Sequence, residues 1–290
     1  MEIALSTGTI DYRDTGGPGP TVVLLHGLLM DGSLWDAPVA DLAVDHRCVV
    51  PTLPLGAHRH PMHPDADLSL PAAARLVTEL LDRLDLHDVT LVGNDTGGAL
   101  VQLIMAAGCD RVGRIVLASC DAFDNFPPGL TGRTLLLTGK LSPRLFGMFL
   151  QQLRLRPFRR LPITFGWLTR RGDATVAGWL RPVLTRPEIR RDAVRMLRAA
   201  AADPGFLEVA AERLPDFDRP ALVAWAVEDR VMPLEHGRRL AQLLPQGRLV
   251  EVADSYTLIP LDQPALLASL IREFTPVRPP APDPEPAAAG

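Results

Sequence analysis

The sequence predicts an α/β fold in which a mostly parallel central sheet has helices on both faces. Short runs of aliphatic and β-branched residues alternate with segments of helical periodicity. Unbroken apolar strands of this kind are typical of a parallel sheet that is buried on both sides. The connections are short, so right-handed strand–helix–strand units are expected. The first ten residues alternate as a strand does, and further strands are expected at 22–25, 48–50, 89–92, 115–118, 222–226 and 249–252.

Local start and stop signals predict two helices between these strands. Apolar residues recur at helical spacing over residues 73–84, behind the start signal of Ser69 and Pro71. A second helix is expected over residues 99–107, and Gly108 ends it. Each helix therefore connects two of the predicted strands.

The alternation of strands and helices stops near residue 124 and resumes near residue 215. Proline, arginine and aromatic residues interrupt helical stretches in this segment, which predicts an inserted helical cap. Its many arginines are expected to coat the solvent-facing sides of the helices. The predicted organisation is a core of residues 1–123 and 216–275, a cap of residues 124–215 and a disordered, proline- and alanine-rich tail of residues 276–290.

Composition and charge limit the classes of function. The chain has 290 residues, of which 47% are hydrophobic and 22% are charged, and its formal net charge is −4. This is a globular composition without a broad basic surface, so no nucleic-acid partner is expected. Three cysteines build neither a disulfide framework nor a four-cysteine zinc site. Without a signal peptide or an apolar run of about 20 residues, a cytoplasmic protein with no membrane partner is expected.

The stretch from Leu91 to Leu100, which reads LVGNDTGGAL, carries the chemistry. A buried strand enters a Gly-x-Asp-x-Gly turn and then a helix, which is the pattern of a nucleophile elbow. Gly93 and Gly97 are needed because larger side chains would collide with the neighbouring strand and helix. Asp95 lies at the start of the helix, where N–H groups and the helix dipole favour an ionised carboxylate. Such a carboxylate can attack carbon.

Over residues 2–275 the sequence resembles the α/β-hydrolase family. Besides the elbow, the resemblance rests on the strand and turn VVLLHGL, which ends at Leu28, and on AWAVEDRVMP, which contains Asp229. It implies that the N–H groups of Leu28 and Thr96 form an oxyanion hole and that Asp229 is the catalytic acid. An aspartate at the elbow is similar to haloalkane and haloacetate dehalogenases and to epoxide hydrolases, which implies a covalent ester intermediate.

One expected residue of this family pattern is missing. When the segment VADSYTLIPLDQP is aligned on Asp254 and Pro264, the position of the catalytic histidine is taken by Thr257. Threonine does not accept a proton at neutral pH as imidazole does. His58, in the loop after an early strand, is an alternative base. The group His58, His60 and His63 also permits a metal site, but solvated loop histidines are an equally simple interpretation, and neither a metal nor a cofactor is predicted.

Further candidate residues lie at the expected rim of the pocket. Asp121 and Asp124 follow the strand at 115–118, and either is an alternative acid or base. Several carboxylates around one pocket would raise the pKa of at least one of them. Because the dehalogenases' usual halide partners are absent, Trp167 and Trp179 of the cap are candidates for that role, although cap packing explains them as well.

The sequence therefore predicts an enzyme that hydrolyses a small organic substrate through Asp95, in a dehalogenase-like or esterase-like reaction. Two alternatives follow from the missing histidine. One is a non-hydrolytic conversion of a metabolite, and the other is a catalytically silent ligand-binding protein. The expected partner is a small-molecule substrate, and the sequence leaves open whether the protein is a monomer or a homodimer.

Overall fold

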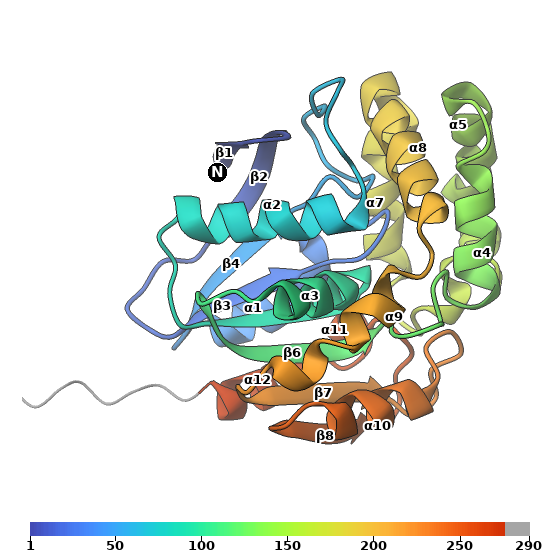
Figure 1. Cartoon of the computed structure of the whole chain (residues 1–290). Coiled ribbons are helices and arrows are strands. Elements are labelled where there is room, and N and C mark those ends of the chain that lie inside the picture. Colours follow the sequence, from blue (N-terminus) through green and yellow to red (C-terminus); the bar gives the residue numbers. More distant parts are fainter. Residues whose placement is uncertain (276–290) are drawn as a thin grey trace, which may run out of the picture.

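The computed structural model describes residues 1–275, which form a single eight-stranded sheet with helices around it (Figure 1). The predicted tail, residues 276–290, lies outside the described residues. The strands are β1 (Glu2–Leu5), β2 (Gly8–Asp14), β3 (Thr21–Leu25), β4 (Arg47–Thr52), β5 (Val89–Asp95), β6 (Val112–Cys120), β7 (Ala221–Ala226) and β8 (Gly247–Val252).

The sheet confirms the predicted α/β fold with a mostly parallel sheet. Its strand order is β1-β2-β4-β3-β5-β6-β7-β8. The pairs β1–β2 and β2–β4 are antiparallel, and the other five pairs are parallel. Every predicted strand is present and extends beyond its apolar run, since backbone pairing continues past the residues that are buried on both faces. The alternating first residues form two strands, because the chain reverses between Leu5 and Gly8.

The helices follow in chain order between and after these strands. They are α1 (Asp36–Leu42), α2 (Leu70–Arg83), α3 (Thr96–Ala107), α4 (Gly129–Thr138), α5 (Pro143–Gln151), α6 (Arg156–Arg159), α7 (Asp173–Thr185), α8 (Pro187–Ala202), α9 (Phe206–Ala211), α10 (Leu234–Leu243), α11 (Ile259–Asp262) and α12 (Pro264–Phe274). None of the helices in the described part of the chain has both the length and the apolar character needed to span a bilayer.

The two helices predicted from local signals are present. Ser69 caps α2 by accepting a hydrogen bond from the backbone N–H of Ala72. Helix α3 begins at Thr96, three residues earlier than predicted, because the Asp95 carboxylate caps its first turn. Gly108 ends α3 with a positive φ of 75°.

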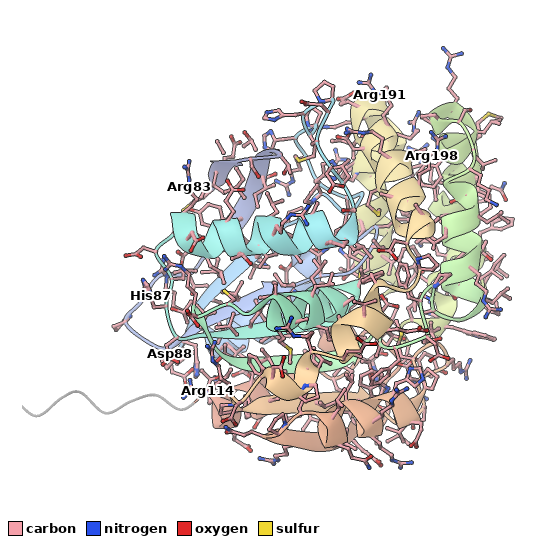
Figure 2. All side chains as sticks on the ribbon, in the orientation of Figure 1. Arg83, His87, Asp88, Arg114, Arg191 and Arg198 are labelled. Carbon is pink, nitrogen blue, oxygen red and sulfur yellow. The ribbon has the colours of Figure 1, made fainter. Side chains whose placement is uncertain are left out.

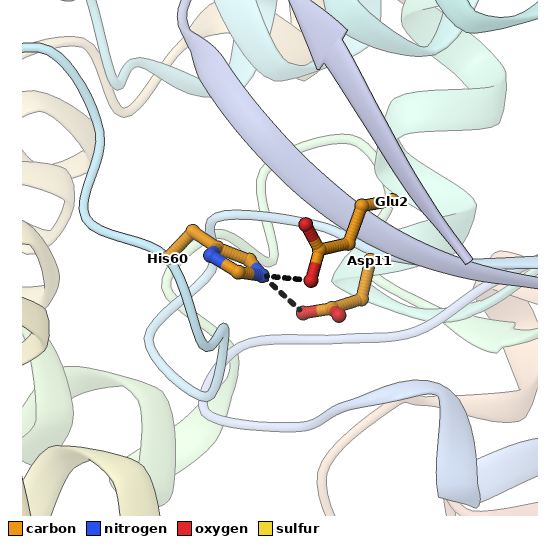
Figure 3. A group of neighbouring side chains, drawn as sticks. All are labelled: Glu2, Asp11 and His60. Atoms are coloured by element: carbon orange, nitrogen blue, oxygen red, sulfur yellow. Dashed lines mark ion pairs between the residues drawn. The ribbon is translucent and has the colours of Figure 1, made fainter.

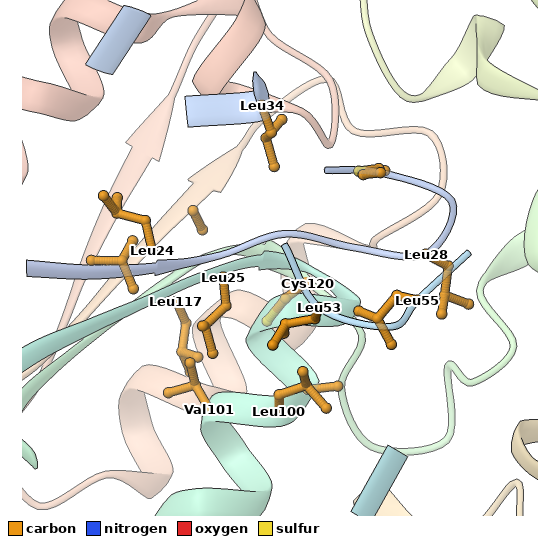
Figure 4. Packing of buried hydrophobic residues seen from close by; sticks show 14 of the residues in the cluster. Leu24, Leu25, Leu28, Leu34, Leu53, Leu55, Leu100, Val101, Leu117 and Cys120 are labelled. Carbon is orange, nitrogen blue, oxygen red and sulfur yellow. The ribbon is translucent and has the colours of Figure 1, made fainter. Parts of the chain in front are cut away.

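The core lies between the sheet and its helices. Helix α3 packs on β5 and β6, whereas α1 and α12 pack together on the other side of the sheet. Figure 4 shows Leu25 and Leu117 of the sheet close to Leu100 and Val101 of α3, and all four side chains are fully buried. Burying apolar area of this kind is the main favourable contribution to folding. The rigid β5–α3 junction that results is what positions Asp95.

The helices between β6 and β7 stand together beside the carboxyl end of the sheet (Figure 1). Helices α4 and α5 pack on α8, and α5 also packs on α7. Arg191 and Arg198 lie exposed on α8 (Figure 2). Helix α9, the last α-helix before β7, packs on α3 instead. Between β6 and β7, the first helices therefore pack mainly on one another, and the last one packs on the core.

Candidate active site

Asp95 lies at the sharp turn between β5 and α3. Its backbone has φ 56° and ψ −132°, a conformation that non-glycine residues rarely adopt. The glycines around it allow the close approach of the chain. A Cβ on Gly97 would lie 2.3 Å from the carbonyl oxygen of Leu25, and one on Gly93 would lie 2.4 Å from that of Gly97. The turn therefore requires both glycines, and it holds the Asp95 side chain at the end of the strand.

The carboxylate of Asp95 accepts hydrogen bonds from backbone N–H groups. Oδ1 accepts a 2.7 Å hydrogen bond from the N–H of Thr96. The backbone N–H of Leu28 also donates to the carboxylate. A Cβ on Gly27 would come within 2.1 Å of Oδ1, so the carboxylate lies directly over the chain at Gly27. Leu28 and Thr96 are the two residues whose amides the family resemblance assigns to the oxyanion hole.

Burial has a larger effect on the pKa of Asp95 than the hydrogen bonds at the start of helix α3 have. The residue is only 6% exposed. Burial raises the pKa of its carboxyl above the usual value, although the hydrogen bonds from Thr96 and Leu28 lower it in part. The sequence alone indicated only that the helix terminus stabilises the ionised carboxylate. The structure adds the cost of removing the charge from water, which makes the carboxylate more basic than an exposed one.

A second carboxyl group is linked to Asp95 through one hydroxyl group. Thr96 Oγ1 lies 2.8 Å from Asp121 Oδ2 and 3.1 Å from Asp95 Oδ1. Asp121 is fully buried, and its Oδ1 has no hydrogen-bond partner among the described residues. Burial, and then the charge of Asp95, raise the pKa of Asp121 well above its usual value. Since one hydroxyl hydrogen cannot serve two carboxylates, a protonated Asp121 that donates to Thr96 Oγ1 satisfies the geometry.

Asp229 and Thr257 form a hydrogen-bonded pair that does not itself line the cavity at Asp95. Thr257 Oγ1 donates to Asp229 Oδ1 at 2.8 Å, and the N–H groups of Val231 and Met232 donate to the same oxygen at 2.9 Å. Burial raises the pKa of Asp229 to about 6, against these hydrogen bonds. The carbonyl oxygen of Thr257 accepts a 2.7 Å bond from Asn94 Nδ2. Thr257 is thereby tied both to Asp229 and to the residue that precedes Asp95.

No histidine lines the cavity at Asp95, and all seven histidines lie within the described residues 1–275. His26 is close in sequence, but its Nδ1 lies 2.9 Å from the Gly27 carbonyl oxygen and its Nε2 accepts from the N–H of Leu53. Burial lowers the pKa of His26. Both of its nitrogens are occupied, so it holds two loops together rather than reaching the cavity.

His58 also lies away from the cavity. It is 1% exposed, and its Nε2 is 3.5 Å from Oδ2 of Asp192 on α8. The same Asp192 oxygen accepts a 2.9 Å hydrogen bond from the N–H of Met62. The structure thus gives His58 a place between a core loop and helix α8, with no direct route to Asp95.

The candidate pocket is a cavity of about 70 Å³ in front of Asp95. This is several times the volume that a single water molecule requires. Its walls are mostly aliphatic and aromatic. Sequence reasoning identified the residues of the elbow and of the turn at Leu28, but not those of the helical segment, because helical periodicity does not show which side of a helix faces a pocket. The cavity residues missed in this way include Thr131, Thr134, Leu135, Phe149, Leu153, Ile163 and Phe165.

Of the predicted site residues, only Leu28, Asp95 and Thr96 line the cavity, and the two tryptophans and Asp124 lie outside its wall. Trp179 is fully buried, and its Nε1 donates a 2.8 Å hydrogen bond to Ser33 Oγ. Trp167 does not line the cavity, although its neighbours Phe165 and Leu168 do. Asp124 is largely exposed and lies 3.8 Å from His236. In the structure, packing accounts for Trp179, and Asp124 is a surface residue.

The histidine-rich loop contributes to a separate group of charged side chains. Nε2 of His60 lies 3.4 Å from Glu2 Oε1 and 3.4 Å from Asp11 Oδ2 (Figure 3). Glu2 and Asp11 are opposite each other in the β1–β2 ladder, where two like charges repel. The His60 ring lies between the two carboxylates. The three side chains have metal-ligating atoms, but they lie at the surface and serve as an ion-pair cluster here.

Comparisons with known proteins concern the family and the fold of the chain. The family described as alpha/beta hydrolase fold matches residues 20–264. The cis-3-alkyl-4-alkyloxetan-2-one decarboxylase of Xanthomonas campestris pv. campestris is 27% identical over 281 residues, 91% of each chain. A haloalkane dehalogenase of Mesorhizobium japonicum is 33% identical over 111 residues, 38% of this chain and 35% of that protein.

A solved structure shows the same fold. The thermophilic esterase from Thermogutta terrifontis superposes with a TM-score of 0.69 over 94% of this chain and 97% of that one. Its sequence identity is 22%, so the likeness concerns the fold.

Proposed function

We propose that this chain, which belongs to the α/β-hydrolase family, hydrolyses a small apolar substrate through a covalent ester on Asp95. One observation carries the proposal. Asp95 Oδ1 accepts hydrogen bonds from both the N–H and the hydroxyl group of Thr96, while the carboxylate borders a mostly apolar cavity. Oδ2, which makes neither of these bonds, is then the oxygen that would meet a substrate.

In the first step, Oδ2 attacks a substrate carbon that bears a leaving group such as a halide or a carboxylate. The Oδ2–carbon bond forms, and the bond to the leaving group breaks with its electron pair going to that group. A buried carboxylate is a stronger nucleophile than a hydrated one, because it has lost water that would otherwise stabilise its charge. The raised pKa of Asp95 has the same cause, because the loss of water also destabilises the charged form relative to the protonated form.

In the second step, water attacks Cγ of the ester. Negative charge then develops on Oδ1, which already accepts hydrogen bonds from the N–H and the hydroxyl group of Thr96. Collapse of this intermediate releases the substrate-derived alcohol and restores the carboxylate. The attacking water must lose a proton. We assign this proton to Asp229, which accepts a hydrogen bond from the cavity-lining Val231, has a pKa of about 6 and has a buried Oδ2 without a hydrogen-bond partner among the described residues.

Ester hydrolysis is the slow step of this scheme. Thr257 occupies the place beside Asp229 with a hydroxyl group that donates to the carboxylate and does not take a proton from water. Loss of a general base typically lowers a rate by about 10²- to 10⁴-fold. The ester on Asp95 is therefore expected to accumulate.

The relatives and the cavity together favour small, largely apolar electrophiles. Relatives are named as a haloalkane dehalogenase and as a decarboxylase of an oxetan-2-one, both of which act on small organic molecules by name. The cavity wall offers aliphatic and aromatic side chains and a few threonines. The hydroxyl groups of Thr131 and Thr164 donate to backbone carbonyl groups, whereas that of Thr134 has no hydrogen-bond partner among the described residues and is therefore available to a leaving group.

The test is a single turnover in ¹⁸O-labelled water with haloalkanes, simple esters and lactones as substrates. Attack of water on the ester puts the label into the Asp95 carboxylate, and mass spectrometry of the peptide that contains Asp95 detects it. Direct attack of water on the substrate would put the label into the product instead and would contradict the nucleophilic role. A protein without adduct, label or product that is still thermally stabilised by the compound would be a ligand-binding protein.

A further inference from the structure

The helices beside the sheet expose many large apolar side chains on one part of the surface. Eight of the thirteen exposed large hydrophobic residues in the described chain lie between residues 130 and 163. Their exposed fractions range from 36% at Ile163 to 67% at Met148. We call this surface the cap face. Its apolar residues are Leu130, Leu137, Leu145, Met148, Leu155, Phe158, Leu161 and Ile163.

The same segment is strongly basic. Between residues 125 and 172 there are nine arginine or lysine residues and no aspartate or glutamate, although the whole chain has a net charge of −4. Some of these cations are neutralised from outside the segment. Arg159 pairs with Asp173, and Arg170 and Arg171 pair with Asp254. Four others are exposed and have no ion-pair partner in residues 1–275, namely Arg133, Lys140, Arg144 and Arg154.

The apolar and basic side chains share the outward sides of α4 and α5. Both helices pack on α8 with their inner sides and form the outer edge of the molecule in Figure 1. On α4, Leu130 and Leu137 are two turns apart with Arg133 between them. On α5, Leu145 and Met148 are one turn apart next to Arg144. Residues at such spacings lie on one side of a helix.

The cavity in front of Asp95 reaches the surface within this segment. Ile163 belongs to the cap face and also lines the cavity. Thr134, Leu135 and Phe149 likewise line the cavity and are partly exposed. A molecule that leaves an apolar phase at the cap face therefore finds an apolar path to the carboxylate.

We propose that the cap face docks on the surface of an anionic lipid bilayer and that the substrate is an apolar molecule taken up from it. Apolar side chains enter the boundary between headgroups and acyl chains, while arginine and lysine bind anionic headgroups. The absence of acidic residues removes the repulsion that such a surface would otherwise exert. The sequence predicted no membrane partner because it has no apolar run of about 20 residues, but a surface contact does not need such a run. Only the substrate class rests on the proposed function.

The experiment measures flotation of the full chain with vesicles. Equimolar phosphatidylcholine and phosphatidylglycerol should bind the protein at low salt, and phosphatidylcholine alone should bind it much less. Binding should weaken as salt increases, because salt screens the charges. Neutralising three cations should weaken binding by about 100-fold, since each contributes a factor of about five. The variant is Arg133→Gln with Arg144→Gln and Arg154→Gln.

A second variant tests the apolar contribution, and two matched variants serve as controls. Replacing three exposed cap-face residues by serine should also weaken binding, and this loss should persist at high salt. Equal numbers of substitutions elsewhere should leave binding unchanged. The apolar variant is Leu137→Ser with Leu145→Ser and Met148→Ser. The controls are Val44→Ser with Val209→Ser and Leu266→Ser, and Arg75→Gln with Arg83→Gln and Arg248→Gln.

Two outcomes would overturn the proposal. One is a vesicle result in which the cap-face variants behave as their controls do, either because all of them bind the anionic vesicles equally or because none of them binds. The other is a dimer of the free protein that the cap-face variants convert to a monomer in sedimentation, because the surface then covers a second copy of the chain. The Asp95→Asn protein should bind vesicles as the unmodified chain does. A failure of the nucleophile proposal is thereby distinguished from a failure of the docking proposal.

Discussion

The two sides of the candidate site differ in how complete they are. On the side of β3 and β5, the Asp95 carboxylate has the amides of Thr96 and Leu28 and a cavity in front of it. On the side of β7 and β8, Asp229 accepts three hydrogen bonds on one oxygen, but the side chain beside it is the hydroxyl group of Thr257. If Asp95 forms the proposed ester, this difference predicts that formation of the ester and its hydrolysis can be separated.

The largest effect is expected for Asp95→Asn. The amide keeps the shape of the side chain but is a far weaker nucleophile, so ester formation should fall by at least about 10³-fold. Intact-mass spectrometry after incubation with a haloalkane or lactone should show an adduct on the unmodified chain and none on the variant. Equal adduct formation by both proteins would place the reactive group elsewhere.

The second largest effect is expected for Thr257→His. An imidazole beside Asp229 supplies a base, so hydrolysis of a preformed ester should accelerate by about 10²- to 10⁴-fold. Adduct mass followed over time measures this rate. Thr257→Val is the matched control, because it fills a similar volume without a base. An unchanged rate in a folded Thr257→His protein would contradict the assignment of this position.

The pH dependence of ester hydrolysis tests the role of Asp229. Burial raises the pKa of this carboxyl to about 6. The ionised form, which can act as a base, therefore decreases below pH 6 and predominates well above it. If the ionised form takes the proton from water, the hydrolysis rate should increase by up to tenfold per pH unit below pH 6 and level off above it. The Asp229→Asn variant should lack this increase. A flat profile in the unmodified chain would exclude Asp229 as the base.

The smallest effect, on stability, is expected for Asp121→Asn. The pKa of Asp121 in the folded chain is raised well above 3.8, mainly by burial and next by Asp95. A raised carboxyl pKa stabilises the folded state at low pH, and this contribution is lost as pH increases from the unfolded toward the folded pKa. The melting temperature of the unmodified chain should therefore decrease more between pH 5 and pH 8 than that of the variant. Parallel decreases would show that Asp121 is ionised in the folded chain.

The sequence was sufficient to predict the architecture, and the structure confirms it. Apolar runs and glycine positions are local signals, so the β5–α3 turn and the parallel sheet could be derived from them. The spatial relation of Asp121 to Thr96 could not be derived, because it depends on how the end of β6 lies against the first turn of α3. The residues of the helical segment that line the cavity could not be predicted from the sequence either. The roles assigned to Asp95, Asp229 and Thr257 stay predictions.

The pinning of one Asp95 oxygen has a stereochemical consequence. If the other oxygen, Oδ2, is the attacking atom, as we propose because Oδ1 is hydrogen-bonded to the N–H group of Thr96, it would approach a substrate from the β5–α3 turn. A leaving group must then point toward the helices above, opposite the incoming oxygen. Displacement at a chiral carbon would invert its configuration, and hydrolysis at Cγ would preserve that inverted centre. From a racemic substrate, the enantiomer that fits the cavity should be converted to an alcohol of the opposite configuration.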